Sequence, residues 1–528
     1  MSRFLRSKGL LAMVAVILLF NLVWIMSQSV LGLDEAVFRA PFLMWEQLKR
    51  PLVLALAGLF VIISYHVKDE LSWEAIDPSG NARIIVLATT AILTWIFSAY
   101  QMNYFFGQEH LGDRLCLIVL WLALWRHPLF IYPFIATITT ISLQFRFPVF
   151  GYFWFLLDKR LPWDMMILFA AYLPVQYCLK LNRRFFVFLA IALTGFFYFN
   201  AGVGKIFYAG GLRWVLGNDM SHLLPAGWIY RMHTWMNQAE IESVARSMSV
   251  FAVPMQVGAL LLELGGILLI WGRRSAQLGL VGVIGLHALI LVTSGIFFWT
   301  WMLLDLVLIF VLWRGRGRFL RPIFNRYHRG LWLAMYCLGI FFLLPTSFFW
   351  YDTPFVNRFR LVGTGASGQT YELAPSDFSL YELEMVQSRF FFLRSEPRLV
   401  ETYGATHSPV VARFLNQVEP AQLPKVKAAF GEDRYSEETS RRFTEFLVYY
   451  THNRYSYKRS WPLRVLNWLQ APNHFFVRRP EGSYQGQEPL VSLTAVDVEY
   501  FTYPTIEIIK ETEIPLWTRP VPPPSGAR

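Results

Sequence analysis

The sequence predicts a multi-pass α-helical membrane bundle of about 8–11 spans, followed by a C-terminal extramembrane α+β domain. Of the 528 residues, 55% are hydrophobic and only 16% are charged, whereas a soluble protein carries about 25% charged residues. The deficit of charge is confined to residues 1–350, where long apolar runs follow one another. Residues 351–518 have the composition of a soluble domain, and the tail 519–528 is rich in proline.

The apolar runs give the candidate spans, because a helix needs about 20 apolar residues to cross a bilayer. Three prolines and Arg146 interrupt the stretch 114–157, so one or two of its pieces are expected to be re-entrant. The expected spans are residues 9–27, 51–67, 84–106, 114–126 with 129–147, 164–179, 185–204, 250–272, 276–296, 297–313 and 331–349.

The first apolar run is preceded by Arg3, Arg6 and Lys8, as in a signal peptide. The run is long for a signal peptide and no cleavage site follows it, so we expect an uncleaved first membrane helix. The next segment, 28–50, mixes apolar and charged residues. It is either an interfacial amphipathic helix or a loop packed on the bundle.

Cationic loops between the expected spans predict the orientation of the chain, because Lys and Arg are enriched in cytoplasmic loops. Six arginines lie between residues 314 and 329, so this loop is expected in the cytoplasm. Arg273 and Arg274 lie two spans earlier and share that side, as does the N-terminus. The loop 205–249 and the C-terminal domain are then expected outside, in the periplasm or a lumen.

Within the C-terminal domain the residue pattern predicts a small α+β fold. Residues 359–374 surround a glycine-rich turn, which is typical of a hairpin. Helices are expected near 381–416 and 436–451, the second with Ser436 as its cap and one apolar face. Residues 491–509 alternate like a half-buried strand.

Composition also excludes some classes of function. The net charge of +12 does not indicate nucleic-acid binding, because the cations flank apolar segments and no basic patch with interleaved aromatic residues occurs. Cys116, Cys178 and Cys337 lie inside apolar segments and are interpreted as small core residues. No helix-periodic pair of metal ligands is present, so no metal site is expected. The lipid bilayer is the partner that composition itself predicts.

Three ionisable residues lie in the middle of successive expected spans, where a charge costs about 2.5–3.5 kcal/mol. They are Glu263, His287 and Asp305. Because they occupy neighbouring spans, they could meet inside the bundle and form a site that handles protons or binds a ligand. The alternative is structural, with a Glu–His or Asp–His pair that locks helices together.

A second set of candidate residues lies at the end of the expected span 185–204 and in the loop that follows it. Asn200, Gly202 and Lys205 are followed in that loop by Trp214. Glycine at 202 allows close approach of another backbone. A desolvated lysine loses affinity for its proton, so Lys205 is a candidate base. The alternative is a lysine that anchors the helix end at the membrane surface.

Several short motifs occur in order along residues 80–310. They are Ala201-Gly202-x-x-Lys205 with Trp214-x-x-Gly217-x-x-Met220, Phe155-Leu-Leu-Asp-Lys159 with Trp163-Asp164, and Glu263-Leu-Gly-Gly with His287 and Phe297-Phe-Trp. These motifs resemble those of the vitamin K-dependent gamma-carboxylase and of its bacterial relatives, the horizontally transferred transmembrane (HTTM) proteins.

The resemblance implies a membrane enzyme in which the lysine matching Lys205 deprotonates reduced vitamin K on the outer side. The oxygenated cofactor then removes a glutamate γ-proton before carbon dioxide adds. The family's catalytic histidine is expected a few residues after Lys159, where this chain has Met165 and Met166. A thioether cannot shuttle a proton.

Three functional hypotheses follow. The first is an HTTM-like membrane protein whose internal polar pocket binds a lipid or quinone-like molecule. The second is a carboxylase-like enzyme that uses reduced vitamin K or another quinone. The third is a non-enzymatic accessory protein with a partner in export or envelope assembly. The candidate catalytic residues are Lys205 and His287, and the candidate binding residues are Glu263, Asp305, Asn200, Gly202 and Trp214.

A reporter fused after Arg528 tests the predicted orientation. We expect alkaline phosphatase to be active at this position, because the cationic loops place the C-terminal domain outside the cytoplasm and the reporter needs disulfides that form only there. The same reporter placed in the loop 314–329 should be inactive. Activity in the loop and none after Arg528 would refute this topology.

Overall fold

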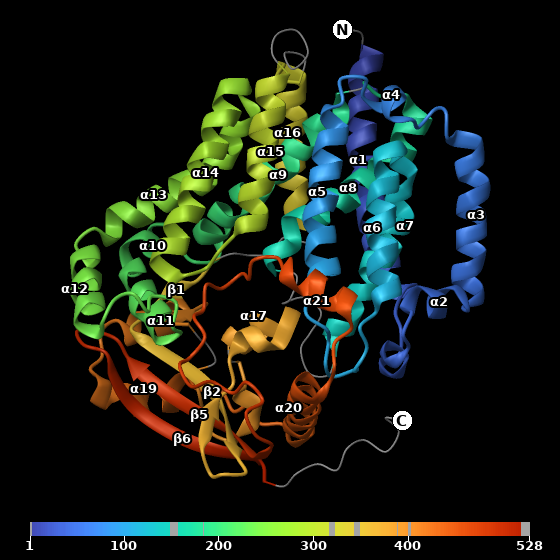
Figure 1. Cartoon of the computed structure of the whole chain (residues 1–528). Coiled ribbons are helices and arrows are strands. Elements are labelled where there is room, and N and C mark those ends of the chain that lie inside the picture. Colours follow the sequence, from blue (N-terminus) through green and yellow to red (C-terminus); the bar gives the residue numbers. More distant parts are fainter. Residues whose placement is uncertain are drawn as a thin grey trace.

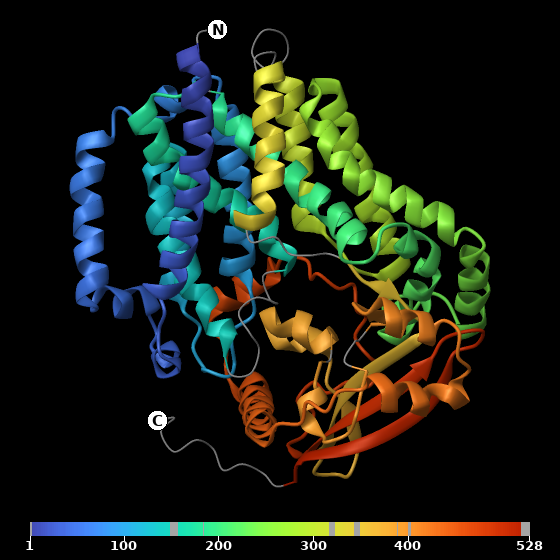
Figure 2. The ribbon, with the colours of Figure 1, turned by 180° about the vertical axis from the view of Figure 1, so that it is seen from behind.

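The computed structural model of the chain describes residues 3–147, 157–182, 184–315, 323–342, 349–387, 389–399 and 403–518. Helices form the N-terminal region, and a small sheet with further helices forms the C-terminal region (Figure 1). The two regions occupy opposite ends of the molecule (Figures 1 and 2). A helical bundle followed by an α+β region is therefore confirmed, and the tail 519–528 lies outside the described residues.

The long helices of the N-terminal region coincide with the predicted spans. They are α1 (Arg3–Ser29), α3 (Pro51–Val67), α5 (Asn81–Ala99), α6 (Leu111–Arg126), α7 (Ile131–Leu143), α8 (Arg160–Leu179), α9 (Phe185–Phe207), α13 (Ala252–Leu264), α14 (Arg273–Ser294), α15 (Trp299–Arg314) and α16 (Arg326–Phe342). Shorter helices lie between them, namely α2 (Leu43–Leu48), α4 (Trp73–Ile76), α10 (Leu212–Gly217), α11 (Leu223–Ile229) and α12 (Gln238–Ser249).

Six helical stretches among the described residues are long and apolar enough to cross a membrane. The number of about 8–11 spans stays a prediction beyond these six. The other helices are shorter, as is α3 with 17 residues, or carry buried charge, as does α8 with Arg160 and Asp164. The six stretches are Lys8–Ser29, Asn81–Ala99, Pro128–Arg146, Phe185–Phe207, Ala252–Ile270 and Arg273–Ser294.

The cationic helix ends gather at one end of the helical region. The start of α1, the end of α15 and the start of α16 all lie farthest from the sheet (Figures 1 and 2). Arg314 and Arg326 belong to these helix ends, whereas Arg316, Arg318 and Arg321 lie outside the described residues. The predicted orientation requires this arrangement, because it places the cationic helix ends on one side of a membrane and the C-terminal region on the other.

The segment 28–50 is neither one amphipathic helix nor a plain loop. It forms a 3-10 turn at Glu35–Arg39 and the short helix α2. The buried carboxylate of Asp113 accepts hydrogen bonds from the backbone N–H groups of Leu43 and Met44, each at 2.8 Å. This carboxylate satisfies the open amides at the start of α2 and fixes the segment against α6.

The C-terminal region contains a four-stranded antiparallel sheet in the order β3–β2–β5–β6. The predicted hairpin is confirmed as β2 and β3. The predicted strand 491–509 is too long, because Pro504 has no amide hydrogen for the ladder and the chain turns there. A further pair joins β1 to β4. The strands are β1 (Tyr351–Asp352), β2 (Phe355–Gly365), β3 (Thr370–Glu372), β4 (Ala405–Thr406), β5 (Leu490–Phe501) and β6 (Glu507–Trp517).

The predicted helix 381–416 is wrong. The chain instead forms α17 (Glu382–Gln387), then β4, then α18 (Pro409–Leu415). Proline disfavours helical geometry in the residue before it, and Pro397 and Pro409 divide this segment. Gly404 has a φ of 63°, a left-handed conformation that also ends a helix.

The predicted helix 436–451 is confirmed as α20 (Glu437–Ser456). The Ser436 hydroxyl accepts a hydrogen bond from the backbone N–H of Thr439 and caps the helix. Phe443 and Phe446 on its apolar face are fully buried. The other helices of this region are α19 (Leu423–Phe430) and α21 (Trp461–Trp468).

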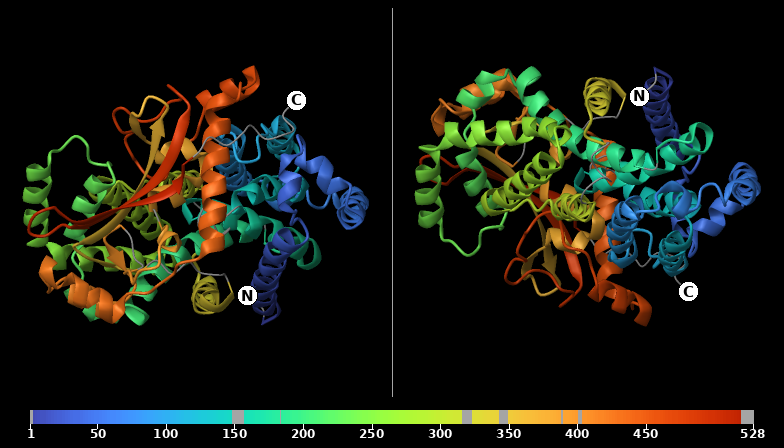
Figure 3. Two further views of the ribbon diagram at one scale, coloured as in Figure 1. Left: turned by 90° about the horizontal axis from the view of Figure 1, so that it is seen from below. Right: turned by 90° about the horizontal axis from the view of Figure 1, so that it is seen from above.

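Aromatic side chains join the two regions into one core. The Tyr381 hydroxyl accepts a hydrogen bond from Asn103 at 3.0 Å and donates one to the carbonyl of Phe147. The rings of Tyr104 and Tyr450 meet edge to face at 5.4 Å. Seen along the helix axes, the sheet and α20 lie across the helical region, and α3 stands outside them (Figure 3). The C-terminal region is therefore packed on the bundle and not held by a linker alone.

Candidate functional site

A cavity of about 90 Å³ lies where α9, α10, α13, α14 and α15 meet the start of the C-terminal region. Apolar and aromatic side chains form most of its wall, and a few polar groups reach it, which is the usual make-up of a ligand site. The lining residues are Phe197, Tyr198, Ala201, Lys205, Trp214, Met220, Leu223, Ala259, Glu263, Leu286, His287, Ile290, Ser294, Ile296, Phe298, Trp301, Trp350 and Asp352.

A buried ion pair crosses one side of the cavity. The Nζ atom of Lys205, near the end of α9, donates to both carboxylate oxygens of Glu263 on α13, at 2.6 and 2.7 Å. The two side chains are only 8% and 13% exposed. The same ammonium group lies 5.2 Å from the ring centre of Trp214 and 5.9 Å from that of Trp350. Aromatic faces attract a cation, so Glu263, Trp214 and Trp350 all stabilise the charge of Lys205.

Gly202 allows the ion pair to form. A Cβ atom at this position would lie 2.9 Å from side-chain carbons of Leu264 and 3.0 Å from its backbone nitrogen. A larger residue would therefore push α9 away from α13. Asn200 lies two residues earlier on α9, is buried and is not among the residues that line the cavity.

His287 forms another part of the wall. Its ring stacks on Phe298 with centres 4.9 Å apart, and it lies 5.6 Å from Tyr198 and 5.8 Å from Trp301. The side chain is buried, and its Nδ1 atom has no hydrogen-bond partner among the residues that the structure describes. A buried imidazole nitrogen without a partner is costly, so a hydrogen bond to a ligand that reaches Nδ1 would offset that cost.

Asp305 lies behind the wall and does not reach the cavity. Its Oδ2 atom accepts a hydrogen bond of 2.6 Å from the hydroxyl of Tyr198. The expected meeting of three ionisable groups is therefore realised in part, because Glu263 and His287 line the cavity and Tyr198 separates it from Asp305. No ion pair or hydrogen bond joins these three residues to one another within the described part of the chain.

Asp352 and Trp350 belong to the site and were not predicted. Asp352 accepts hydrogen bonds from Asn218 at 2.9 Å and from the indole of Trp350 at 3.1 Å. Burial raises the pKa of Asp352 to about 7. The signal in the sequence is the Trp-Tyr-Asp triplet directly after the last apolar segment, which brings polar groups of the C-terminal region to the cavity.

A second, smaller cavity of about 40 Å³ lies on the other side of Phe298. Lys159 and Asp158 form an ion pair of 2.5 Å at its edge. His474 also lines it, and its ring meets Phe298 edge to face at 5.0 Å. Burial lowers the pKa of His474, so this imidazole is neutral. Phe298 thus separates two histidines that belong to two cavities.

Met165 and Met166, which stand where the resemblance implies a catalytic histidine, do not reach either cavity. Met165 and Met166 on α8 are each 1% exposed and pack in the hydrophobic core. Asp164 accepts a hydrogen bond of 2.8 Å from Arg160 within the same helix. Phe155 and Leu156 lie outside the described residues. The segment around Lys159 therefore contributes an ion pair to the second cavity and no imidazole.

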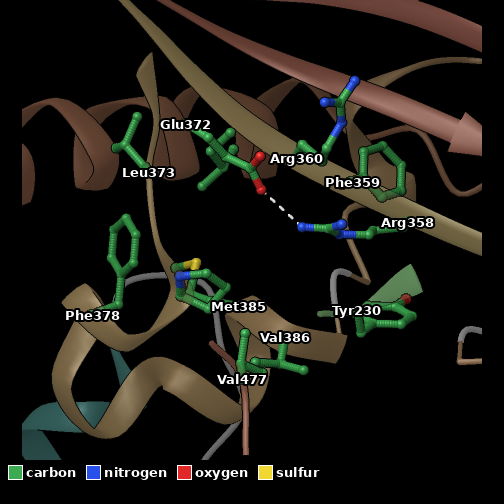
Figure 4. Close-up of a pocket in the computed structure, with 12 residues that line it drawn as sticks. Tyr230, Arg358, Phe359, Arg360, Glu372, Leu373, Phe378, Met385, Val386 and Val477 are labelled. Atoms are coloured by element: carbon green, nitrogen blue, oxygen red, sulfur yellow. Dashed lines mark hydrogen bonds and ion pairs between the residues drawn. The ribbon is translucent and has the colours of Figure 1, made fainter. Parts of the chain in front are cut away.

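A third cavity, under the sheet, is structural (Figure 4). It measures about 20 Å³ and lies between β2, β3 and α17. The guanidinium of Arg358 donates to the carboxylate of Glu372 at 2.8 Å and to the carbonyl of Ile229 at 2.6 Å. The two charged groups at this cavity, Arg358 and Glu372, are therefore paired with each other. The cavity has room for about one water molecule.

Within the described part of the chain, no group of three or more His, Cys, Asp or Glu side chains could hold a metal ion. Cys116, Cys178 and Cys337 are free thiols, and the prediction that all three lie in the core is wrong, because Cys178 and Cys337 are exposed. Comparison with protein-family models, curated proteins and solved structures finds no match to this chain. The site must therefore be interpreted from its own geometry.

Removing one partner of the Lys205–Glu263 pair should destabilise the fold. Lys205→Met or Glu263→Met alone leaves a buried charge without a partner, so each should lower the free energy of unfolding by about 3–5 kcal/mol. The double variant leaves no charge and should recover most of that loss. The measurement is reversible unfolding in mixed detergent micelles.

The matched control is the ion pair between Lys180 and Glu70, whose side chains are 60% and 49% exposed. Lys180→Met should cost less than about 1 kcal/mol. Equal effects of Lys205→Met and Lys180→Met would contradict the account of a buried pair.

Glu384 should make stability depend on pH. Burial raises the pKa of this carboxyl to about 8 from 4.5, and neither oxygen has a hydrogen-bond partner among the described residues. Between these values the folded chain holds a proton that the unfolded chain releases, so stability falls as pH rises, by at most about 1.4 kcal/mol per pH unit.

Glu384→Gln should flatten this dependence between about pH 5 and pH 8. A slope should remain, because burial also raises the pKa of Glu382 and that of Asp352, the latter to about 7. Glu445→Gln removes an exposed carboxylate and serves as the control. Unfolding followed across this range would contradict the assignment if Glu384→Gln kept the slope of the wild-type chain.

Proposed function

We propose that the chain is an integral membrane protein whose buried cavity binds the ring of a lipid-soluble, quinone-like molecule. The observation that carries the proposal is the cavity wall, where aromatic rings surround the Lys205–Glu263 pair and the unpartnered Nδ1 of His287. We place the N-terminus in the cytoplasm and the C-terminal region outside it, following the cationic helix ends.

Exposed apolar surface supports the membrane location. Helix α3 stands apart from the bundle (Figures 1 and 2), and Val61 and Ile62 on it are 65% and 60% exposed. On α13 and α14, Leu261 and Leu278 are 64% and 72% exposed. A soluble protein rarely exposes apolar surface of this extent, whereas hydrocarbon chains of a bilayer would cover it.

The chemistry of the wall suits a planar ring with oxygen substituents. Aromatic side chains pack favourably on such a ring in offset or edge-to-face geometry. A quinone oxygen accepts hydrogen bonds, which the Lys205 ammonium can donate. The hydroxyl of a quinol donates one, which an imidazole nitrogen such as Nδ1 of His287 can accept.

The cavity is too small to accept an aromatic ring without a change in its wall. A cavity of about 150 Å³ holds benzene, and this cavity measures about 90 Å³. Its wall must therefore move when a ring enters. Met220 lines the cavity, and a flexible thioether side chain changes conformation at low cost.

We favour the binding of a quinone-like molecule over carboxylase-like catalysis as the function of this site. A base at position 205 must first lose its proton, but the carboxylate of Glu263 stabilises the charged ammonium. Lys205 could act as a base only after its proton passes to Glu263 or another acceptor. The methionines at 165 and 166 supply no imidazole for a second proton transfer.

Filling the cavity should abolish binding of a quinone. Ala259 lines the cavity on α13, so Ala259→Phe places a ring where the ligand would lie. We expect a naphthoquinone to quench the tryptophan fluorescence of the purified chain, because Trp214, Trp301 and Trp350 line the cavity. Quenching at low ligand concentration should weaken by about tenfold or more in Ala259→Phe.

Leu261→Phe is the control on the same helix, because Leu261 points away from the cavity and is 64% exposed. It should bind like the wild-type chain. Equal quenching in the wild-type chain and in Ala259→Phe would show that the naphthoquinone binds elsewhere and would refute the proposal.

A further inference from the structure

An open groove of about 780 Å³ lies at the junction of the helical and C-terminal regions. One wall is formed by α10 and the start of α13, and the other by α18. The side chain of Asn416, the residue directly after α18, donates to the carbonyl of Gly217 on α10 and links the two walls. The groove therefore exists only because the two regions are packed together.

The groove and the buried cavity lie on opposite faces of β1. Tyr351 lines the groove and its neighbour Asp352 lines the cavity, because successive side chains of a strand point in opposite directions. The Tyr351 hydroxyl donates to the carbonyl of Ala209, which closes the floor of the groove. The two spaces are thus separate sites.

The position of the groove is that of lipid headgroups if α9 and α13 span the membrane. Phe207, the last residue of α9, and Ala252, the first of α13, both line it. These are the ends of two of the six stretches that are apolar enough to cross a bilayer. The ends of a membrane span lie at the interface with the headgroups.

Two cations face the groove from opposite walls. Arg213 belongs to α10 and Arg413 to α18, and both line the groove with exposed side chains. Neither guanidinium has an ion-pair or hydrogen-bond partner within the described part of the chain. Both act electrostatically on Tyr351 at the floor. Asp219 also lines the groove, but its carboxylate accepts a hydrogen bond from the backbone N–H of Ser221.

Apolar side chains surround the cations. Phe207 and Leu216 line the groove and are 76% and 71% exposed, and Val410 on the opposite wall is 48% exposed. A free anion gains nothing from this surface, whereas the glycerol backbone and the first methylene groups of a lipid would cover it.

We propose that this groove binds the headgroup of an anionic phospholipid, with the phosphate between Arg213 and Arg413 and the acyl chains along Phe207 and Leu216. Guanidinium groups bind phosphate oxygens through paired, charge-assisted hydrogen bonds. A lipid in this position connects α10 with α18 and so secures the C-terminal region to the bundle. The inference rests on the membrane location proposed above.

The test uses the full chain, purified in detergent from carbonate-washed membranes and titrated with phosphatidylglycerol or phosphatidylcholine in native mass spectrometry. Wild-type protein should bind phosphatidylglycerol more tightly. The double variant Arg213→Gln/Arg413→Gln should bind it about tenfold more weakly. Arg213→Lys/Arg413→Lys keeps both charges and should retain most of the affinity.

The control variant is Arg434→Gln/Arg441→Gln, which removes the same net charge from two exposed ion pairs of the C-terminal region. It should bind phosphatidylglycerol like the wild-type chain. Thermal unfolding in detergent verifies that all variants fold, since the four arginines are exposed.

Three results would overturn the inference. They are equal affinity of wild type and Arg213→Gln/Arg413→Gln, equal binding of phosphatidylcholine and phosphatidylglycerol, and binding of glycerol phosphate as tight as that of the lipid. Absence of the wild-type chain from washed membranes would instead refute the proposed membrane location, so the two failures are distinguishable.

Discussion

A charged side chain in apolar surroundings needs a partner, and the pair of Lys205 and Glu263 meets this requirement between α9 and α13. Desolvation opposes both charges, and the two short hydrogen bonds together with the rings of Trp214 and Trp350 offset that cost. The contact requires glycine at 202, since any larger residue would hold the helices apart. The position of α13, and with it one wall of the cavity, therefore depends on this pair.

The C-terminal region completes the cavity that the helices begin. Trp350 and Asp352 close one side. A β-bridge between Ile296 and Phe475 fixes the connection of α14 and α15, next to His287 and Phe298. Because one aromatic core spans both regions, movement of the C-terminal region would alter the cavity. The fold thus couples the surface of the C-terminal region to a site buried among the helices.

Much of this architecture is visible in the sequence, because apolar runs and cationic loops report directly on long helices and their ends. The hairpin β2–β3 and the cap of α20 at Ser436 are likewise local features with clear signals. The helix expected at 381–416 failed because the segment is divided by prolines and a left-handed glycine, whose effect outweighed its apolar content.

The site was predictable only in part, because contacts between distant segments leave no local pattern. Glu263 and His287 stood out as ionisable residues inside apolar runs, and Lys205 as a lysine behind glycines. Nothing near Asp305 indicates that Tyr198 would separate it from the cavity. Asp352 reaches the cavity only because the C-terminal region folds back onto the helices. The periodicity of apolar residues along the sequence does not encode this packing.

If the buried cavity binds a small lipid-soluble molecule, as we propose, that molecule should accompany the chain through purification. The most direct measurement is mass spectrometry of the small molecules retained by the chain after gentle extraction from native membranes. We expect a stoichiometric aromatic, oxygen-bearing compound that is present in the wild-type chain and in Leu261→Phe but lost in Ala259→Phe, which leaves the Lys205–Glu263 pair intact. A chain that retains only bulk phospholipid, with the same profile in Ala259→Phe, would contradict the proposal.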